Sequence, residues 1–417
     1  MESPAFTSTT AERRLRAVHP DVGAVAVGSV DVDSGQAVWR TPADQRAELD
    51  RAFVLLREGG WPLGIDVCAL VDGELAAPVG ADLVGDRAPS RARSTTERVP
   101  LTVVVCTRQR PDSLQHALQR IVALEPAPAE VIVVDNAPQD DATAAVVDSF
   151  GGAVRRVVEE VPGLSRARNC GLAAVNTPYV AFTDDDVDPD PAWVDVLAAT
   201  FAATPGTVCV SGAVLPASLT TRAELLFAMI GGYGTDVAER DYHLSVDPRP
   251  SALFPFHPKL LGTGANMAFR TEALLGLRGF DTALGAGTPA RGGEDIDIAV
   301  RLLHAGHLLV RQPAAVLWHP SPSTEEGLRR QMRDYGCGLA AAFTKFASHR
   351  GTNTAMVGRM AAGMGYLLSP SSPRRRDRAD GFPGALTRAE WAGLAEGPVA
   401  YLSAVRLRRR LDRQQAG

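Results

Sequence analysis

Apolar runs and stretches of helical spacing alternate along the chain from residue 101 to about residue 320. Short apolar runs at 101–106, 131–134 and 180–183 are typical of buried strands. Between the first two runs, an apolar residue recurs every three or four positions, as on one face of a helix. Strands that alternate with helices in this way predict an α/β fold with a doubly wound, mostly parallel sheet flanked by helices.

Residues 1–98 are predicted to form a small accessory α+β unit. Apolar runs at 22–30 and 65–71 predict strands, and the apolar spacing at 43–58 predicts a helix. Residues 86–100 are rich in Arg, Ser, Thr and Pro, which predicts a linker between this unit and the next domain.

Residues 321–417 are predicted to form a helical extension. Helical spacing extends over 325–346, where several small residues permit close packing with another helix. Inside the main domain, scattered glycines and prolines at 217–258 predict a loop-rich insertion. The chain is therefore expected to consist of the accessory unit, a catalytic domain at 101–320 and this extension.

The composition is that of an ordinary globular protein, with 45% hydrophobic and 22% charged residues among 417. A net charge of -5 argues against a nucleic-acid partner. Five cysteines without a CxxC pair fit a reducing cytoplasm and offer no thiolate metal site. The polar N-terminus resembles no signal peptide, and no run of about 18 apolar residues predicts a membrane span. We therefore expect a cytoplasmic protein.

Three consecutive carboxylates, Asp184, Asp185 and Asp186, directly follow the apolar run at 180–183. Alternate residues of an extended segment point the same way, so Asp184 and Asp186 could bind one divalent ion while Asp185 turns away. Carboxylate oxygens suit Mg²⁺ or Mn²⁺, which also bind a substrate's phosphates. The alternative is an acidic turn that caps the next helix.

Other polar residues stand at comparable places. Asp135 follows the strand predicted at 131–134, Glu294 and Asp295 open a predicted helix, and His319 ends a short apolar run. Helix capping and a structural histidine are the plain alternatives for the last three. If the sheet is doubly wound, these positions converge at the carboxyl ends of its strands, where such folds bind ligands.

A series of short motifs, taken together, resembles the family 2 inverting glycosyltransferases of the GT-A fold. The motifs are, in order, VVVCTR at 103–108, VVDN at 133–136, SRARNCG at 165–171, FTDDD at 182–186, GANM at 264–267, GFD at 279–281, GED at 293–295 and His319. Each motif is weak alone, and their order and spacing make the resemblance specific. It spans about 101–320.

The resemblance implies roles for individual residues. A nucleotide-diphosphate sugar is expected to bind at Thr107, Arg108, Asp135, Arg166, Arg168, Asn169, Asp184, Asp185, Gly264 and Asn266. A divalent metal (Mn²⁺ or Mg²⁺) is expected at Asp184, Asp186 and His319, and Asp295 matches the catalytic base, with Glu294 beside it. The family's commoner first motif, Pro-Thr-Tyr-Asn, is replaced by Cys-Thr-Arg-Gln, so the nucleotide base stays open.

The resemblance implies transfer of a sugar to a hydroxyl acceptor of unknown class, by a single displacement. One alternative is a nucleotidyltransferase, which is expected to have a glycine in its first loop; residues 107–112 have none. Another is a non-catalytic sugar-nucleotide binding protein. Arginines cluster at 374–378 and 406–410, so peripheral contact with an anionic membrane is a hypothesis beside a plain helical extension.

Overall fold

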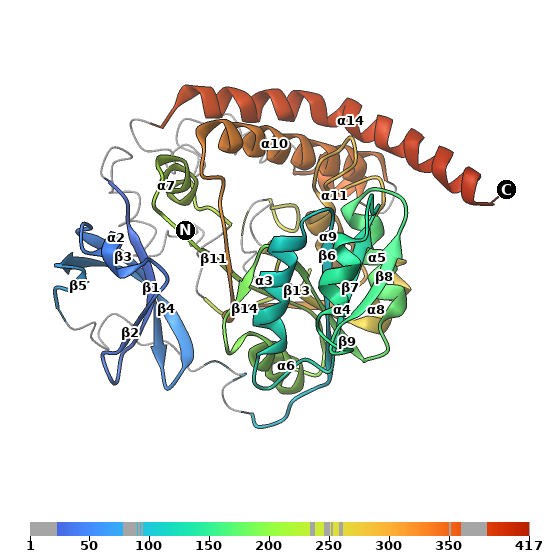
Figure 1. Cartoon of the computed structure of the whole chain (residues 1–417). Helices are drawn as coiled ribbons and strands as arrows, with labels where there is room; N and C mark the ends of the chain where they lie inside the picture. The colour runs from blue at the N-terminus through green and yellow to red at the C-terminus, as the bar shows by residue number, and fades with distance from the viewer. Residues whose placement is uncertain are drawn as a thin grey trace.

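The chain forms a large sheet with helices on both faces, a smaller N-terminal sheet at its side, and two long helices across one end (Figure 1). This computed structural model describes residues 23–77, 90, 92, 95–233, 238–245, 251, 253–257, 262–349, 352–359 and 382–416. Part of the predicted linker and the arginines at 374–378 lie outside the described residues.

The large sheet is mixed but mostly parallel. Its strands within the described residues are β6 (Leu101–Thr107), β7 (Glu130–Asn136), β8 (Arg155–Glu159), β9 (Tyr179–Asp184), β10 (Asp188–Pro189), β11 (Thr207–Pro216), β12 (Arg240–Tyr242), β13 (Met267–Arg270) and β14 (Leu308–His319). They are ordered β10-β14-β11-β13-β9-β6-β7-β8, with β12 paired to β14. β6 is parallel to both β7 and β9, and β11 is parallel to β14.

Helices cover both faces of this sheet. On one face lie α3 (Pro111–Val122), α4 (Ala142–Asp148) and α6 (Trp193–Ala203); on the other lie α5 (Leu164–Ala174), α8 (Thr271–Gly276) and α9 (Glu294–His304). Successive β6 side chains point to opposite faces, so Val103 and Val105 enter one core while Val104 enters the other. Burial on both faces explains why the strands are continuous apolar runs.

The strand directions bring several strand ends to one edge. β13 is antiparallel to both β9 and β11, so β9 and β11 run the same way. β6, β7, β9 and β14 therefore all end at the same edge, where Thr107, Asp135, Asp184 and His319 lie. The sequence prediction of an α/β fold with a mostly parallel sheet and a helical C-terminal region is confirmed.

The N-terminal sheet differs from its prediction in one element. It comprises β1 (Ala26–Asp31), β2 (Ala37–Trp39), β3 (Arg51–Glu58), β4 (Trp61–Val71) and β5 (Glu74–Leu75) in the order β2-β1-β3-β4-β5, beside the short α2 (Ala43–Arg46). The helix predicted over 43–58 is wrong, because residues 51–58 form β3. β3 lies between β1 and β4 and is buried at 52–56, so its apolar run lacks the alternation that indicates a strand.

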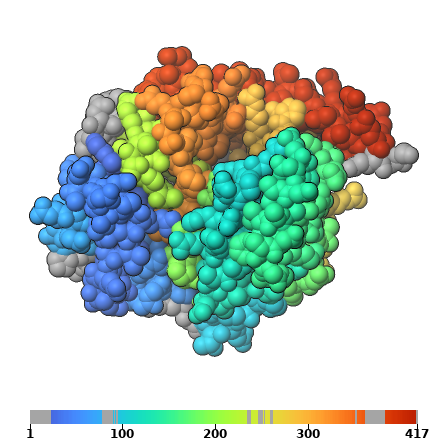
Figure 2. Space-filling view, viewed as in Figure 1, coloured from blue at the N-terminus to red at the C-terminus, as the bar shows by residue number. Residues whose placement is uncertain are grey.

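The N-terminal sheet shares a core with the large sheet. Phe53, Leu55 and Val67 pack in one apolar cluster with Leu215 and Trp318 of β11 and β14. The opposite face of β3 packs in a separate cluster within the N-terminal sheet. Figure 2 shows this unit against the rest of the molecule.

The predicted insertion at 217–258 contains regular structure. α7 (Arg222–Met229) begins with a capping box between Thr221 and Glu224, a signal that the sequence contains. A description of this region as loop-rich is therefore incomplete.

The C-terminal region consists of α10 (Glu325–Ser348), α11 (Asn353–Val357) and α14 (Gly384–Ala416). α14 lies along α10 (Figure 1). A Cβ added to Gly397 would lie 2.5 Å from the Cβ of Ala340, so glycine permits this close approach. Among the helices described, none is both long and apolar enough to cross a bilayer.

Candidate metal and catalytic site

Asp184, Asp186 and His319 form a compact group at the carboxyl edge of the sheet. Asp184 ends β9, Asp186 lies two residues further on, and His319 ends β14. His319 Nε2 lies 3.7 Å from Asp184 Oδ2 and 3.4 Å from Asp186 Oδ1. One ligand atom from each of the three lies within 4.8 Å of the others. The sequence-predicted metal ligands are therefore brought together.

The atoms in this group fit a divalent ion. His319 Nδ1 lies 2.7 Å from the carbonyl oxygen of Pro320, to which it donates, so Nε2 faces the carboxylates. Asp186 Oδ1 is buried and has no hydrogen-bond partner among the described residues. Two carboxylates and one imidazole are ligand types that Mn²⁺ accepts.

Asp184 and His319 have pKa values that are shifted by their mutual attraction. Burial alone would raise the pKa of Asp184, but the hydrogen bond from His319 and the charge of Arg168 outweigh burial and lower it. Burial would lower the pKa of His319, but Asp184 and Asp186 outweigh it and raise the pKa. A cation is thus favoured at this position, whether a proton on His319 or a metal ion.

Asp185 turns away from the metal group, as expected. Its Oδ2 accepts a hydrogen bond from Thr107 Oγ1 at 2.7 Å, and its Oδ1 accepts one from Arg110 Nη1 at 2.8 Å. Arg110 also donates to Asp186 Oδ2 at 2.8 Å through Nη2. Burial raises the pKa of Asp185 to about 6. Thr107 and Asp185 therefore support the group of Asp184, Asp186 and His319 from the protein interior, and their side chains do not point out of the site.

Arg168 is a buried connection between the metal group and the predicted catalytic residues. It is 2% exposed, and its Nη1 donates to Glu294 Oε1 at 2.9 Å. Nη2 donates to the carbonyl oxygen of Gly264 at 3.0 Å and lies 3.7 Å from Asp184 Oδ1. A buried arginine bound on three sides fixes the relative position of these groups.

Glu294 and Asp295 occupy different environments at the start of α9. Glu294 is buried against Arg168, whereas Asp295 remains partly exposed. Asp295 Oδ2 accepts a hydrogen bond from the amide of Gly264 at 3.3 Å, and Oδ1 accepts one from Ile296 at 2.8 Å. Burial raises the pKa of both carboxyls, and the charge of Asp295 further raises that of Glu294.

Asn169 and Asn266 have their amide groups bound inside the protein. Asn169 binds the backbone of Phe280 through both ends, donating to its carbonyl at 2.9 Å and accepting from its amide at 2.8 Å. Asn266 is fully buried; it donates to Ala213 and Ala315 at 2.8 Å each and accepts from the indole of Trp193 at 2.9 Å. These contacts favour a structural role over the expected nucleotide contact.

The remaining predicted nucleotide residues lie around the same edge. Asp135 is 1% exposed; its Oδ2 accepts from Arg156 Nη2 at 2.7 Å, while Oδ1 has no partner among the described residues. The Arg108 side chain is exposed. Arg166 instead reaches the extension, where its Nη2 lies 3.1 Å from Asp412 Oδ1 of α14.

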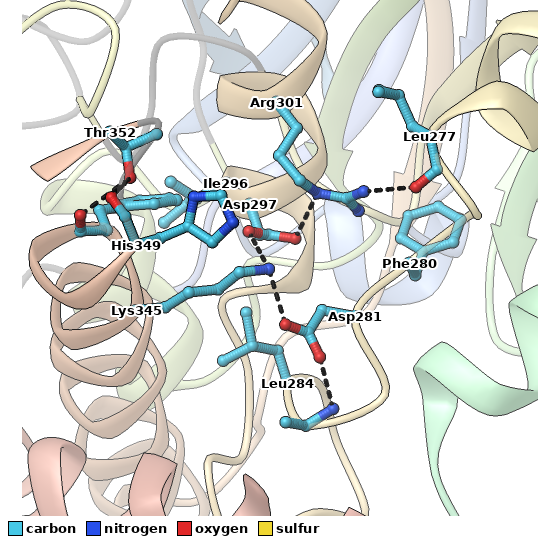
Figure 3. Close-up of polar contacts among 12 residues, drawn as sticks. Leu277, Phe280, Asp281, Leu284, Ile296, Asp297, Arg301, Lys345, His349 and Thr352 are labelled. Carbon is cyan, nitrogen blue, oxygen red and sulfur yellow. Dashed lines mark hydrogen bonds and ion pairs between the residues drawn. The ribbon is translucent and has the colours of Figure 1, made fainter.

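Asp281 of the predicted GFD motif binds the helical extension (Figure 3). Lys345 Nζ of α10 lies 2.6 Å from Asp281 Oδ2 and 2.6 Å from Asp297 Oδ1. Arg408 of α14 donates to Asp281 Oδ1 at 2.6 Å. The extension is therefore ionically attached to α9 and to the loop before it.

Two residues at the site were not singled out from the sequence. Arg110 binds Asp185 and Asp186, and its position just past the first strand was a usable signal, because a basic residue there faces the acidic triplet. Tyr233 lies with its ring 4.7 Å from that of His319, and its hydroxyl donates to the carbonyl of Pro320 at 3.2 Å. No local pattern marks Tyr233.

Two named relatives align with part of the chain. The pre-mycofactocin glycosyltransferase of Mycobacterium tuberculosis is 28% identical over 243 residues, which are 56% of this chain and 44% of that protein. The glucosyl-dolichyl phosphate glucuronosyltransferase of Haloferax volcanii is 25% identical over 199 residues, which are 44% of this chain and 57% of that protein. The chain thus spans about half the length of these relatives.

Solved structures align over a larger share of the chain at low similarity. A mannosyltransferase from Pyrobaculum calidifontis in complex with GDP-Man and Mn²⁺ has a TM-score of 0.45 and 20% identity, covering 77% of this chain and 88% of that chain. GalNAc-T7 with UDP, GalNAc and Mn²⁺ has a TM-score of 0.44 and 14% identity, covering 67% and 59%.

The family model described as "Glycosyl transferase family 2" matches residues 102–257. This segment contains β6 to β9 and the acidic triplet, and so includes two of the three grouped metal-ligand candidates. Glu294, Asp295 and His319 lie beyond the matched residues but are brought to the same edge by the fold. Residues 102–257 of this chain are thus similar to glycosyl transferase family 2.

Proposed function

We propose that this chain transfers a glycosyl group from a nucleotide-diphosphate sugar to an acceptor hydroxyl, in a metal-dependent single displacement that inverts the anomeric carbon. The observation that carries the proposal is the group of Asp184, Asp186 and His319 at the carboxyl edge of a family 2 domain. Ligands of open α/β sheets bind at this edge.

A divalent ion bound by Asp184, Asp186 and His319 would stabilise the negative charge that develops on the departing diphosphate. Arg108 and Asp135 stand along the same edge, on the side of β6 and β7, and are the residues proposed to hold the nucleotide, while Thr107 holds Asp185 in place. Arg168 is enclosed by protein groups, so its proposed task is to hold Glu294, Gly264 and Asp184 in position.

Asp295 is the proposed base. The acceptor oxygen attacks the anomeric carbon as its proton moves to the Asp295 carboxylate, and the bond to the diphosphate oxygen breaks with its electron pair on the leaving group. Asp295 suits this task better than Glu294, because it is partly exposed while Glu294 is buried in its pair with Arg168. One base without an enzymic nucleophile gives inversion.

The alternatives require different ligands. A nucleotidyltransferase would bind a nucleoside triphosphate, and a binding protein would bind a sugar nucleotide without turnover. The match of residues 102–257 to the family 2 model favours glycosyl transfer, and both relatives in the comparison are glycosyltransferases by name.

A thermal-shift panel tests the proposal. UDP-, dTDP-, GDP- and CMP-sugars are each added with and without Mn²⁺, since ligands of the native state raise the melting temperature. We expect stabilisation by one nucleotide class that requires Mn²⁺ and is lost in Asp186→Ala. A shift with nucleoside triphosphates alone would favour the nucleotidyltransferase.

We also propose that α14 contacts an anionic membrane through its outer face, defined as Trp391, Val399, Leu402, Arg406, Arg409, Arg410 and Arg413. All of these residues are exposed, and Val399 is 68% exposed. Arg408 and Asp412 bind Asp281 and Arg166, which holds α14 in this orientation. Four outward arginines on a protein of net charge -5 favour an anionic surface, and the apolar residues beside them suit its interface.

Vesicle flotation tests this contact. The protein is expected to float with vesicles that contain phosphatidylglycerol at low salt and to remain below with phosphatidylcholine alone. The triple variant Arg406→Gln, Arg409→Gln, Arg410→Gln should lose flotation, whereas Arg329→Gln, Arg330→Gln on α10 should retain it. Absence of flotation of the wild-type protein at low salt would refute the contact.

A further inference from the structure

The N-terminal sheet binds the segment that follows the acidic triplet. Arg57 of β3 forms a two-pronged ion pair with Asp190, in which Nη1 lies 3.1 Å from Oδ1. Asp190 is fully buried. Arg40 donates to Asp188 Oδ2 at 2.5 Å. Both aspartates lie within four residues of Asp186, so two arginines of the N-terminal unit hold the chain directly after a proposed metal ligand.

The same segment is paired with the strand that carries the third proposed ligand. β10 pairs with β14, with Asp188 opposite Trp318, and the amide of Asp190 donates to the carbonyl of Val316 at 3.1 Å. Trp318 directly precedes His319. The segments that carry Asp186 and His319 are therefore joined to each other immediately beside these residues.

Trp318 is also held by the N-terminal sheet. The Arg40 guanidinium carbon lies 5.1 Å from the centre of the Trp318 ring, and the ring packs in the cluster that contains Phe53 and Leu55. Arg40 thus contacts both segments at once, since it binds Asp188 with its guanidinium and covers Trp318 with its plane.

Charge explains why such support is needed. Residues 184–190 contain five aspartates in seven positions, which repel one another. Arg110 and Arg168 compensate the triplet from inside the catalytic domain. Arg57 compensates Asp190, and Asp188 faces Arg40 together with Arg120, whose Nε lies 3.6 Å away. Two of the five carboxylates thus depend on cations of the N-terminal sheet.

We infer that the N-terminal sheet is part of the metal site of this enzyme, with Arg57 and Arg40 as positioning residues that hold the Asp186 and His319 segments at the spacing a divalent ion needs. The inference rests on the proposed function and assigns a role to a unit outside the family match at 102–257. Neither arginine touches the proposed ligands.

A positioning role and a purely electrostatic role of Arg57 and Arg40 predict opposite changes in metal affinity when either arginine is replaced. Removing a positive charge near a cation site reduces repulsion, so a purely electrostatic influence would tighten metal binding. Loss of positioning weakens it, and changes to residues behind metal ligands typically cost about 10- to 100-fold in affinity. We expect weaker binding, by about 10-fold or more.

The experiment is calorimetric titration of Mn²⁺ into the metal-free full-length protein, without a sugar nucleotide. Arg57→Gln and Arg40→Gln are compared with the wild type and with Arg46→Gln, which lies in the same unit but pairs with Glu74. Both test variants should bind Mn²⁺ more weakly, and the control should bind like the wild type. Circular dichroism verifies that each variant is folded; because Arg40 is more exposed than Arg57, Arg40→Gln provides the result if Arg57→Gln does not fold.

Unchanged or tighter Mn²⁺ binding in folded variants would overturn the inference and leave the proposed function standing. Absence of Mn²⁺ binding by the wild type would overturn the metal-dependent function and this inference together. Hydrogen exchange at 184–192, measured without metal, supplies a second readout: we expect faster exchange in both test variants and no change in Arg46→Gln.

Discussion

At the scale of single residues, the site separates four carboxylates by their surroundings. Asp184 has a lowered pKa, because His319 and Arg168 outweigh its burial, while burial raises the pKa of Asp185 to about 6. Glu294 and Asp295 both have raised pKa values. The carboxyl group proposed to bind a cation, Asp184, is thus kept charged, whereas the carboxyl group proposed to accept a proton, Asp295, binds a proton more readily.

The proposed base gives a pH prediction. The proposed base acts as the Asp295 carboxylate, and burial raises the pKa of this group. On acidification, activity should therefore be lost at a higher pH than the ordinary pKa of a carboxyl group, which is about 4. In Glu294→Gln a negative neighbour is lost and Arg168 is freed, so the acidic limb of the kcat/KM profile should move to lower pH. Asp295→Asn should lose at least about 100-fold in kcat.

The control for this profile is Glu326→Gln, on an exposed turn of α10, which should reproduce the wild-type curve. Wild-type-like kinetics in Asp295→Asn would exclude it as the base. An acidic limb that does not move in Glu294→Gln would show that the two carboxyls do not interact during turnover.

Asn266 gives a prediction about stability. Asn266→Ala would leave two buried carbonyl oxygens and one indole N–H without partners, at about 1–3 kcal/mol each. We expect the free energy of unfolding, measured with urea, to fall by about 3 kcal/mol or more. Exposed Asn176→Ala should change it by less than about 0.5 kcal/mol. A stable Asn266→Ala protein that fails to bind sugar nucleotides would instead restore the nucleotide contact expected from the sequence.

The sequence indicated which residues come together at the sheet edge better than it indicated which residues hold them in position. Asp184, Asp186 and His319 are recognisable because each stands at a strand end, and parallel strands share an edge. Asn169 and Asn266 have the same motif context, yet their partners are backbone groups far along the chain, such as Phe280 and Ala315. No local pattern reveals such partners, so a motif residue that supports the site cannot be told from one that binds substrate.

At the scale of elements, α10 lies between the loop before the proposed catalytic residues and α14. A Cβ on Gly338 would lie 2.8 Å from Gly292, in the loop that precedes Glu294. Another face of α10 receives α14, where Gly397 permits close approach. The sequence predicted α10 almost to its ends because amphipathic spacing continues for many turns. It predicted a helix where β3 lies, because the buried middle strand of a sheet has no alternation.

The ion pairs in Figure 3 give a prediction for this attachment. Burial would raise the pKa of Asp281, but Lys345 and Arg408 outweigh it and lower the pKa below 3.8. A lowered pKa stabilises the fold above the unfolded value of about 3.9, and this stabilisation disappears as pH falls through the folded pKa. The free energy of unfolding of Asp281→Asn should therefore be about 3 kcal/mol lower than that of the wild type at pH 7, and this difference should be smaller below pH 4.

Urea unfolding at several pH values from 7 to 3 measures this difference. The exposed pair of Glu326 and Arg329 provides the control, since Glu326→Gln should produce no measurable change at any of these values. An Asp281→Asn difference that stays constant from pH 7 to pH 3 would contradict an ionic attachment of the extension.

At the scale of the whole molecule, the segments predicted as separate units share cores. The sequence indicated three parts because a linker rich in Arg, Ser, Thr and Pro precedes residue 101, and because the family resemblance ends near residue 320, where helical spacing follows. It could not indicate that one face of β3 packs on Trp318, because a residue buried between two sheets and one buried within a single sheet have the same apolar character. The N-terminal sheet is therefore expected to unfold together with β14 rather than independently of it.

Two neighbouring leucines of β3 test this coupling. Leu55 and Leu56 are both 2% exposed, but Leu55 packs in the cluster shared with Trp318 and Leu56 packs within the N-terminal sheet. Each Leu→Ala substitution should cost about 2–5 kcal/mol, so the pair is matched in chemistry and burial. Hydrogen exchange separates their effects, because a cavity beside Trp318 loosens β14 directly. We expect Leu55→Ala to accelerate exchange in residues 308–319, whereas Leu56→Ala should act mainly in residues 26–31 and 51–58. If both variants left β14 unchanged, the N-terminal sheet would be an independent unit, and support of the His319 segment would have to come from the catalytic domain alone.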